Sequence, residues 1–416
     1  MQNNMDARYL TPEEVKQSLV NLSQLVFEVT DDCNLRCVYC AYGKMYCDYD
    51  ERGKKYLQLS DVKRLIDHLA ELWKNSLPEA AVPETTLGFY GGEPLLNVPF
   101  IKDVIDYMDS LNLNRKIKYS MTTNGVLLDR YMDYLVEKDF TLLVSLDGDE
   151  YADGYRLNKD GHNLFPVVMK NVRKLKEKYP DYFASQVDFN SVLHDRNDVE
   201  SLLKFFKEEL SKKPNLSEIS TVGLNPQTRE MFDKMYNSIR KSIHKSENCE
   251  QLIDELFLGS PEVYSVLRNI ETESDNVIRS YKRLLPAGNN GYVPTGTCVP
   301  FSRKMFVTVN GKLLPCEKVS HAYYLGRVTA DELSLDCVEI AEKHNGYLKK
   351  VLENCEGCAQ KLRCLQCVYQ IDGLTQHVVS CRQHISQKGW EKYNADCFKY
   401  LNTKRGLYRK ILDAMR

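Results

Sequence analysis

The sequence predicts an α/β fold, a partial (β/α)6 barrel of the TIM type followed by a C-terminal domain rich in cysteine. Two observations predict this class. Six strand-like runs alternate with helical patterns through the first half of the chain, and nine of the fourteen cysteines lie from Cys298 onward. Alternation of strands and helices over this length implies a parallel sheet with right-handed crossovers. Four more cysteines lie between residues 33 and 47, so two cysteine-rich ends flank a cysteine-poor body.

The strand-like runs are short and rich in apolar and β-branched residues. They lie at residues 25–30, 85–90, 116–122, 141–146, 186–193 and 219–224. Helical spacing of apolar residues fills the intervals at residues 60–73, 99–111, 129–136, 165–178 and 197–210. A parallel barrel carries its working residues at the carboxyl ends of its strands, so the segments directly after these runs are the candidate site.

Length and composition indicate a globular chain of more than one unit. Its 416 residues exceed one ordinary domain, and 43% of them are hydrophobic and 27% charged. The expected units are an N-terminal segment (1–23), the barrel (24–225), a helical connector (226–290), the cysteine-rich domain (291–385) and a C-terminal helix (386–416). Residues 226–290 show helical spacing without strands, which fits a plain connector or helices that help to form a peptide channel.

Charge and hydropathy exclude several classes of partner. A formal net charge of -2 gives no electrostatic case for binding nucleic acid. The first residues lack the apolar core of a signal peptide, and no run approaches the roughly 18 apolar residues of a membrane span. We therefore expect a cytoplasmic protein without a membrane partner. In that compartment fourteen cysteines favour metal ligation or redox chemistry over disulfides.

Cys33, Cys37 and Cys40 stand in a C-x3-C-x2-C spacing after the first strand-like run. Three thiolates on one loop can hold three irons of a [4Fe-4S] cluster and leave the fourth iron open. Structural zinc is the alternative, with Cys47 as a candidate fourth ligand. The spacing, Tyr39 and the preceding segment LVFEVT resemble the signature of the radical S-adenosylmethionine (radical SAM) enzymes. The resemblance implies that these cysteines are catalytic, because S-adenosylmethionine (SAM) chelates the open iron and its reductive cleavage releases a 5'-deoxyadenosyl radical.

A second motif, formed by Gly91, Gly92, Glu93 and Pro94, follows the second strand-like run. Two glycines let a backbone approach a ligand closely, and Glu93 can accept a hydrogen bond from an ammonium group. As a bare tetrapeptide it is equally a turn. Its place after the strand resembles the GGEP motif of the radical SAM family, which contacts the amino group of SAM.

Further cofactor contacts follow the third and fourth runs. Thr123 and Asn124 belong to a TTNG segment that resembles the family's TNG segment, which lines the cofactor pocket. Ser145 is followed by Asp153 and Arg156 in a D-x2-R spacing. In similar peptide-modifying members this serine reaches the ribose and this arginine clamps the SAM carboxylate, for which a bidentate guanidinium is suited. Ser145 is equally able to cap the following turn.

The C-terminal cysteines resemble the SPASM domain, an extension that carries auxiliary iron-sulfur clusters in radical SAM peptide maturases. It begins with a type I′ hairpin signal, Asn310-Gly311, between two apolar runs. By order, the resemblance assigns one auxiliary [4Fe-4S] cluster to Cys355, Cys358, Cys364 and Cys381, and a second, nearer the barrel, to Cys298, Cys316 and Cys367. The usual pattern has three residues between the cysteines that match Cys364 and Cys367, whereas this chain has two.

The nearer auxiliary cluster lacks one expected ligand. Members with a fully ligated nearer cluster have another cysteine shortly after the first, but residues 299–306 contain none. We therefore expect an open iron there, available to a substrate thiolate or another ligand. A zinc ribbon is the alternative for this domain. The remaining cysteines, Cys47, Cys249, Cys337 and Cys397, are expected to be ordinary thiols.

The resemblance implies a radical SAM maturase of ribosomally made, post-translationally modified peptides (RiPPs). Such an enzyme abstracts a hydrogen from a precursor peptide and installs a thioether or carbon-carbon crosslink. The alternative within the same chemistry is an anaerobic sulfatase-maturing enzyme, which converts cysteine or serine to formylglycine. The alternative of another class is a non-catalytic, metal-bound scaffold that binds a peptide.

Two further partners are expected beside the peptide. Flavodoxin or ferredoxin would supply the electron. Only residues 1–23 precede the first strand, so we expect leader recognition to come from another protein or another surface.

Overall fold

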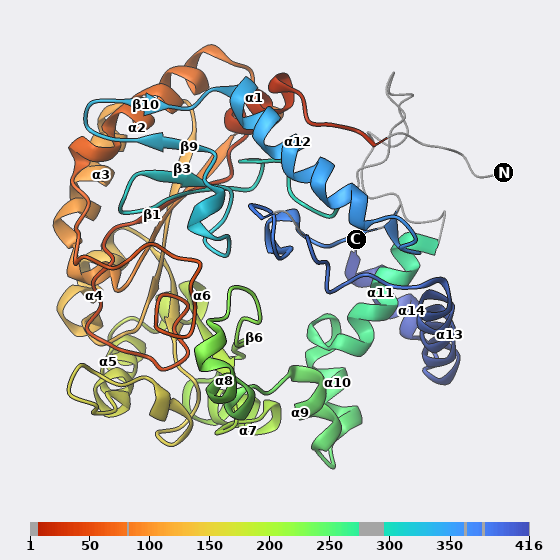
Figure 1. Cartoon of the computed structure of the whole chain (residues 1–416). Coiled ribbons are helices and arrows are strands. Elements are labelled where there is room, and N and C mark those ends of the chain that lie inside the picture. The colour runs from red at the N-terminus through yellow and green to blue at the C-terminus, as the bar shows by residue number, and fades with distance from the viewer. Residues whose placement is uncertain (1–6, 81–82, 274–294, 362–363, 377–378, 416) are drawn as a thin grey trace. The chain divides into compact units, whose positions relative to one another are not determined.

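The computed structural model describes residues 7–80, 83–273, 295–361, 364–376 and 379–415. Two compact units divide the chain. One unit comprises Leu10–Asn237 with Cys298–His344, and the other comprises Met1–Tyr9, Ser238–Thr297 and Asn345–Arg416. Figure 1 labels the elements of both units.

The first unit contains the predicted parallel sheet. Its strands are β1 (Gln24–Glu28), β2 (Glu84–Tyr90), β3 (Lys116–Thr123), β4 (Thr141–Ser145), β5 (Val187–Leu193) and β6 (Asn215–Glu218). Each pairs in parallel with the next in chain order. The predicted α/β class is confirmed, because crossover helices connect the strands.

The crossover helices are α2 (Leu59–Asn75), α3 (Val98–Ser110), α4 (Leu128–Glu137), α5 (Phe165–Lys178) and α7 (Val199–Phe205), which a π-helical turn, η3 (Phe206–Leu210), extends. They lie around the outside of the strands in Figure 1. In α2, Val62, Leu65, Ile66 and Leu69 recur at helical spacing and are buried against the sheet side. One further helix, α1 (Pro12–Val20), precedes the first strand, and another, α6 (Pro180–Gln186), was not predicted.

The sixth strand lies earlier than the sequence predicts. The apolar run 219–224 predicts a strand, but β6 is Asn215–Glu218, a short polar segment that pairs with β5. Gly223 has a φ of +71°, which ends extended backbone within the run. Ile219 packs instead with Tyr39, Met45 and other side chains of the loop that carries Cys33, Cys37 and Cys40. Residues 219–224 are therefore apolar because they contact that loop, not because they form a strand of the sheet.

Part of the expected C-terminal domain extends the barrel sheet. β7 (Lys304–Val307) pairs in parallel with β1, and β8 (Lys312–Leu314), β9 (Gly326–Val328) and β10 (Leu333–Ser334) follow in antiparallel order. The result is a sheet of ten strands, ordered β10-β9-β8-β7-β1-β2-β3-β4-β5-β6.

The predicted hairpin at Asn310-Gly311 is confirmed, but its predicted turn type is wrong. A type I′ turn requires positive φ at both central residues, and here Gly311 has a φ of +73° whereas Asn310 is not among the residues with positive φ. Thr308 donates its N–H to Lys312 O (2.9 Å), so three residues form the loop. This matches a type I turn followed by a left-handed glycine.

Helices dominate the described part of the second unit. They include α9 (Ile239–Lys245), α10 (Cys249–Leu256), α11 (Pro261–Glu273), α13 (Gln387–Thr403) and α14 (Leu407–Met415). α11 and α13 are joined by a hydrogen bond from the Tyr393 hydroxyl to Ser265 O (2.8 Å). α8 (Arg229–Met235), which begins the expected connector, belongs to the barrel unit, and α12 spans Cys337–Asn354. Within the described residues, no helix is long and apolar enough to cross a bilayer.

Candidate active site at the cysteine loop

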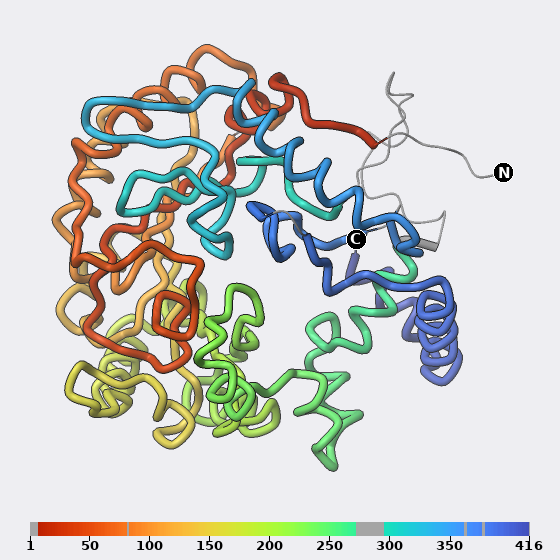
Figure 2. Tube along the Cα trace, viewed as in Figure 1, coloured from red at the N-terminus to blue at the C-terminus, as the bar shows by residue number. Residues whose placement is uncertain are grey.

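The three cysteines of the first motif lie on the loop between β1 and α2, drawn in red in Figure 2. Backbone hydrogen bonds fix this loop. Arg36 N–H donates to Leu157 O (2.6 Å), Val38 N–H to Tyr155 O (3.0 Å), and Gly43 N–H to Cys40 O (2.8 Å). The segment that follows β4 therefore holds the cysteine loop along its length.

Burial disfavours the thiolate form of Cys33 and Cys37. It raises the pKa of Cys37 to about 12, and the neighbouring Cys40 and Cys33 add to the rise, while Arg156 opposes it. Burial also raises the pKa of Cys33. The mutual effect shows that the three thiols are neighbours. Thiols in this state bind a metal only by losing their protons, so a cation must supply the compensating charge.

The predicted glycines do approach a backbone closely, and that backbone belongs to the cysteine loop. A Cβ on Gly92 would lie 1.9 Å from Asp32 O, and a Cβ on Gly91 would lie 2.4 Å from Thr30 O. Gly92 N–H donates to Thr30 O (2.9 Å), and Glu93 N–H donates to Asp32 O (3.0 Å). The two glycines thus position the loop that carries Cys33.

Glu93 is fully buried, and its carboxylate binds the next motif. It accepts hydrogen bonds from the Thr123 hydroxyl (2.7 Å), Asn124 N–H (2.8 Å) and Leu95 N–H (3.1 Å). Burial raises the pKa of Glu93, whereas these donors oppose the rise. The side chain therefore serves as a clamp between two strand ends. Pro94 is buried directly after it and begins a short 3-10 turn.

Asn124 connects the third strand end to the cysteine loop. Its side-chain NH2 donates to Asn34 Oδ1 (2.7 Å) and lies 3.8 Å from Cys33 Sγ. The structure thus brings Glu93, Thr123 and Asn124 together beside Cys33. Ser145 ends β4, is half-buried and pairs in the sheet with Asn190.

Arg156 lies in a buried polar group under the cysteine loop. It donates to the Tyr39 hydroxyl (3.1 Å) and its Nε lies 3.5 Å from Asp153 Oδ1. The Tyr39 hydroxyl in turn donates to Asp147. Burial alone lowers the pKa of Arg156, but the neighbouring Tyr39, Cys37 and two aspartates raise it well above its usual value. Arg156 is therefore a permanent buried cation close to Cys37.

Two members of this group, Asp147 and His194, were not among the predicted site residues. Both are fully buried, and His194 Nε2 lies 3.7 Å from Asp147 Oδ2. The Tyr39 and His194 rings stack with centroids 5.9 Å apart. Asp147 lies two residues after the end of β4 and His194 directly follows β5, and this position is the signal that could have identified them.

A second group of thiols lies in the other unit. The pKa of Cys355 is raised to about 11, first by burial and then by Cys364, Cys358 and Cys381. The same neighbours, Cys381 and Cys358, contribute to the raised pKa of Cys364. The four cysteines predicted to share a cluster are therefore mutual neighbours.

The residues predicted for the nearer auxiliary cluster are divided between the units. Cys298 and Cys316 belong to the barrel unit and Cys367 to the other. Burial and Glu317 raise the pKa of Cys316 to about 11. Glu317 Oε2 lies 3.3 Å from Cys316 Sγ and 2.8 Å from Lys304 Nζ. The grouping of the three cysteines stays a prediction.

The numbers of thiols in the two groups fit iron-sulfur clusters. Three neighbouring thiols on one loop, and four in the second group, match the ligand numbers of an open and a closed [4Fe-4S] cluster. Among the described residues, no three His, Cys, Asp or Glu side chains are grouped closely enough to hold one metal ion.

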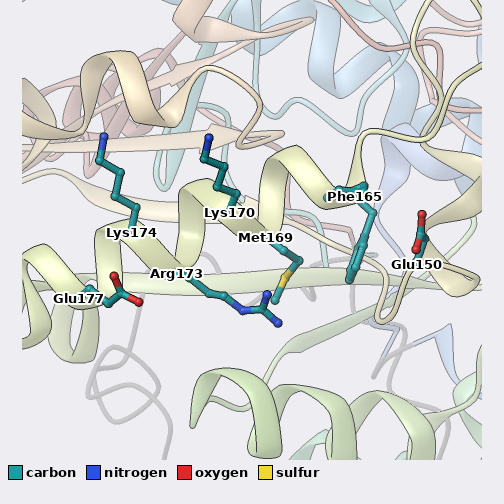
Figure 3. Close-up of a pocket in the computed structure, with 8 residues that line it drawn as sticks. Glu150, Phe165, Met169, Lys170, Arg173, Lys174 and Glu177 are labelled. Carbon is teal, nitrogen blue, oxygen red and sulfur yellow. The ribbon is translucent and has the colours of Figure 1, made fainter.

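A separate groove lies on the surface of α5. It has a volume of about 570 Å³, and Phe165, Met169, Lys170, Arg173 and Lys174 are among the residues that line it. Figure 3 shows the two lysines extending together from the helix. Arg173 pairs with Glu209 (2.7 Å) and Lys174 pairs with Asp129. None of the predicted site residues is among its lining residues.

Comparison with known proteins agrees with the geometry of the barrel. The family model described as the radical SAM superfamily matches residues 27–208. A cysteine-type anaerobic sulfatase-maturating enzyme of Clostridium novyi (strain NT) is 29% identical over 227 residues, covering 51% of this chain and 58% of that enzyme. The radical SAM cyclopropyl synthase TigE of Paramaledivibacter caminithermalis is 26% identical over 215 residues, covering 50% of this chain and 42% of the synthase. The chain spans about half the length of these curated relatives.

A solved structure described as native anSMEcpe with bound AdoMet has the same fold, with a TM-score of 0.60 at 19% identity. It covers 94% of this chain and 98% of that chain. The matched family uses SAM and a [4Fe-4S] cluster, for which the neighbouring Cys33, Cys37 and Cys40 are suited. Residues 27–208 of the chain therefore match the radical SAM superfamily.

Proposed function

We propose that this enzyme modifies a side chain of a peptide or protein, and that it installs a crosslink in a ribosomally made precursor. One observation carries the proposal. The radical SAM site at Cys33 is accompanied by a second group of four neighbouring thiols, Cys355, Cys358, Cys364 and Cys381. Four cysteines at these spacings suit an auxiliary [4Fe-4S] cluster. Both curated relatives described above act, by name, in radical SAM or maturation chemistry.

The residues of the barrel site divide into ligands and supports. Cys33, Cys37 and Cys40 would hold the cluster, and SAM bound there supplies a 5'-deoxyadenosyl radical after one-electron reduction. Glu93 and Asn124 hold the cysteine loop against the ends of β2 and β3. Gly91, Gly92, Pro94, Thr123 and Ser145 would complete the walls of the cofactor pocket.

Arg156 is proposed to orient the SAM carboxylate. Its guanidinium stays charged at any working pH and is already positioned by the Tyr39 hydroxyl and Asp153. Because these partners fix the side chain before the cofactor binds, little ordering entropy remains to be lost.

Crosslinking balances as a two-electron oxidation of the substrate. A carbon-hydrogen bond loses its hydrogen atom to the 5'-deoxyadenosyl radical. A carbon-sulfur or carbon-carbon bond then forms as the substrate releases one further proton and one electron. Cys355, Cys358, Cys364 and Cys381 would hold the cluster that receives this electron, and Cys298, Cys316 and Cys367 would hold another with an open iron. A flavodoxin or ferredoxin would supply the electron that starts the reaction.

Formylglycine formation is the second candidate function. Its support is the similarity to a cysteine-type anaerobic sulfatase-maturating enzyme across half of this chain. The chemistry also begins with hydrogen abstraction from a side chain and also releases a second electron. The two candidates differ in product, because formylglycine contains a carbonyl oxygen where the substrate carried its thiol or hydroxyl.

Product analysis separates the candidates. Reconstituted enzyme, SAM and a reductant would be incubated anaerobically with two peptides, a short precursor encoded beside this gene and a sulfatase-derived peptide with a central cysteine. A crosslink appears as loss of two hydrogen atoms from the precursor, with loss of an alkylatable thiol if it is a thioether. Formylglycine appears as replacement of the cysteine thiol by an aldehyde, which a hydrazide probe captures.

The matched control is the Cys33→Ala/Cys37→Ala/Cys40→Ala variant, which should form neither product nor 5'-deoxyadenosine. If the native enzyme releases no 5'-deoxyadenosine with either peptide yet binds one of them, the proposal fails in favour of a peptide-binding scaffold. Release of 5'-deoxyadenosine with only the sulfatase peptide would reject crosslinking and support the second candidate.

A further inference from the structure

Three side chains of the second unit form a group that the radical SAM site does not use. Cys249 is the first residue of α10, His244 lies in the last turn of α9, and Glu262 lies in the first turn of α11. Cys249 Sγ is 3.9 Å from His244 Nδ1. His244 Nε2 is 3.0 Å from Glu262 Oε1. The imidazole therefore bridges a thiol on one ring nitrogen and a carboxylate on the other.

This order is that of an activated nucleophile. An imidazole beside a thiol takes its proton, and a carboxylate on the far ring nitrogen orients the ring and stabilises the imidazolium. The start of a helix also favours a thiolate, because its backbone N–H groups are directed toward the anion. Cys249 has both an adjacent imidazole and a position at the start of a helix. The sequence alone does not reveal the group of three, because Glu262 belongs to another helix.

Burial of the carboxylate supports the assignment. The Glu262 side chain is only 9% exposed, whereas the His244 side chain is 55% exposed. Glu262 Oε2 is buried without a hydrogen-bond partner. A carboxylate desolvated in this way gains from a hydrogen-bond donor, so Glu262 is placed to hold the orientation of the His244 ring. Cys249 is itself partly exposed, so small molecules can reach this residue.

Other charged groups surround the three residues. On α9, Arg240 Nε lies 3.8 Å from Glu262 Oε1. On α10, Glu250 pairs with Lys404, which follows α13, and Asp254 lies further along the same helix. From α13, Tyr400 faces the group, and burial together with Glu262, Asp254 and Cys249 raises its pKa. The Tyr400 phenol therefore stays neutral. Glu262 and Glu250 each lie beside a cation, so together they add little net charge to the group.

We propose that Cys249, His244 and Glu262 form a modification site at which Cys249 reacts with low-molecular-weight disulfides. The thiolate attacks one sulfur of the disulfide, the sulfur-sulfur bond breaks, and the other half leaves as a thiolate that takes its proton from His244. The cysteine becomes a mixed disulfide, and the disulfide reagent is the oxidant. No residue beyond Cys249, His244 and Glu262 is needed for this exchange, because the leaving thiolate needs only a proton. The site acts independently of the proposed peptide modification.

The test uses the full-length, cluster-loaded enzyme and oxidised glutathione as the probe. Mass spectrometry of peptides follows the mixed disulfide at each cysteine with time, at about pH 6.5 and about pH 8.5. Cys47 is the matched control, because it is exposed and lies in the loop between β1 and α2. At about pH 6.5 only about 1% of an ordinary thiol is ionised. The adjacent imidazole can take the proton, so Cys249 should react about tenfold faster than Cys47.

Two variants separate a reactive site from an accessible thiol. His244→Gln and Glu262→Gln should each slow the reaction of Cys249 at about pH 6.5 several-fold while the Cys47 rate is unchanged. Lys245→Gln, beside His244 in the same helical turn, should leave both rates unchanged. Iron content and the far-ultraviolet circular dichroism spectrum verify that each variant is folded. Equal rates for Cys249 and Cys47 at both pH values, or a Cys249 rate indifferent to His244→Gln, would overturn the proposal.

Discussion

Gly92 makes the close backbone contact that the sequence predicts, but with the cysteine loop and not with a ligand. Two glycines after a strand predict that a backbone comes close to something, and the sequence suggests a bound ligand. In the structure the neighbours of the glycines include the carbonyl oxygens of Thr30 and Asp32. The need for glycine is local, but the identity of the approaching group depends on residues far away in the chain.

Replacing Gly92 with alanine should therefore remove the barrel cluster. The new methyl group would lie 1.9 Å from Asp32 O, and this oxygen already accepts a hydrogen bond from Glu93 N–H (3.0 Å). The cysteine loop must shift, so we expect Gly92→Ala to lose roughly four irons after reconstitution. Gly53→Ala is the matched control, because a Cβ there meets only the end of Lys55 at 3.8 Å. Equal iron in both variants would contradict the positioning role.

Glu28 supplies a second prediction for a single residue. It is 2% exposed at the end of β1, and it accepts a hydrogen bond from Val309 N–H (2.9 Å). Burial raises its pKa from 4.5 to about 7, although Val309 and Arg52 oppose the rise. Between these values the unfolded chain gives up the proton before the folded chain does. Ionisation of Glu28 therefore lowers the free energy of unfolding as pH rises through this window.

Glu28→Gln should abolish that loss, because the amide keeps an oxygen for Val309 and never ionises. Relative to the native enzyme, the variant should gain up to roughly 3 kcal/mol in unfolding free energy between about pH 5 and about pH 8. Urea unfolding at the two pH values measures the change. Glu51→Gln, at an exposed carboxyl group of the neighbouring loop, should follow the native profile. A difference between Glu28→Gln and native enzyme that is the same at both pH values would exclude this explanation.

At the scale of elements, periodicity and turn residues predicted much of the barrel. The helix at Phe165–Lys178 has the predicted bounds, and the first five strands differ from prediction by at most two residues at either end. The sixth strand was misplaced, because a polar edge strand beside an apolar loop has weaker periodicity than its neighbour. The parallel pairing of β7 with β1 joins residues 280 positions apart, so no local pattern could reveal it.

The hairpin between β7 and β8 depends on Gly311. Its φ is +73°, and a Cβ would lie 1.9 Å from Val328 O in β9. Gly311→Ala should destabilise the barrel unit by at least about 2 kcal/mol, from left-handed strain and from the clash. Hydrogen exchange should show lost protection at the amides of β7 and β8. Gly346→Ala, in the middle of α12 with nothing within 4 Å, should instead be neutral or slightly stabilising.

At the scale of the whole molecule, cysteine order predicted which thiols are neighbours. Spacing placed Cys33, Cys37 and Cys40 on one loop, and in the structure Cys40 and Cys33 both contribute to the raised pKa of Cys37. The order of the later cysteines likewise paired Cys355 with its three neighbours. What order could not supply is the buried network of Tyr39, Asp147 and Arg156, because it joins the segments that follow two separate strands, β1 and β4. Local sequence spacing identifies the candidate cysteine ligands. The buried polar residues that contact their loop come together only when the chain folds.

Iron and sulfide analysis tests the cluster assignment for the complete chain. Three [4Fe-4S] clusters predict roughly twelve irons with matching sulfide in anaerobically reconstituted enzyme. Cys33→Ala/Cys37→Ala/Cys40→Ala should reduce this to roughly eight, because it removes every ligand of the barrel cluster. Cys355→Ser/Cys358→Ser should also hold roughly eight irons, yet it should retain the barrel cluster and its SAM-dependent change in electron paramagnetic resonance.

The two losses should be additive, because the mutated thiols belong to different compact units. The native enzyme could instead contain only about four irons, all of which the triple variant loses. That result would support the barrel cluster and reject both auxiliary clusters. Zinc without sulfide would reject the iron-sulfur assignment for both groups. The native enzyme could also contain roughly eight irons, with roughly four in each variant. That result would reject only the cluster assigned to Cys298, Cys316 and Cys367. These are the cysteines that do not all belong to one compact unit.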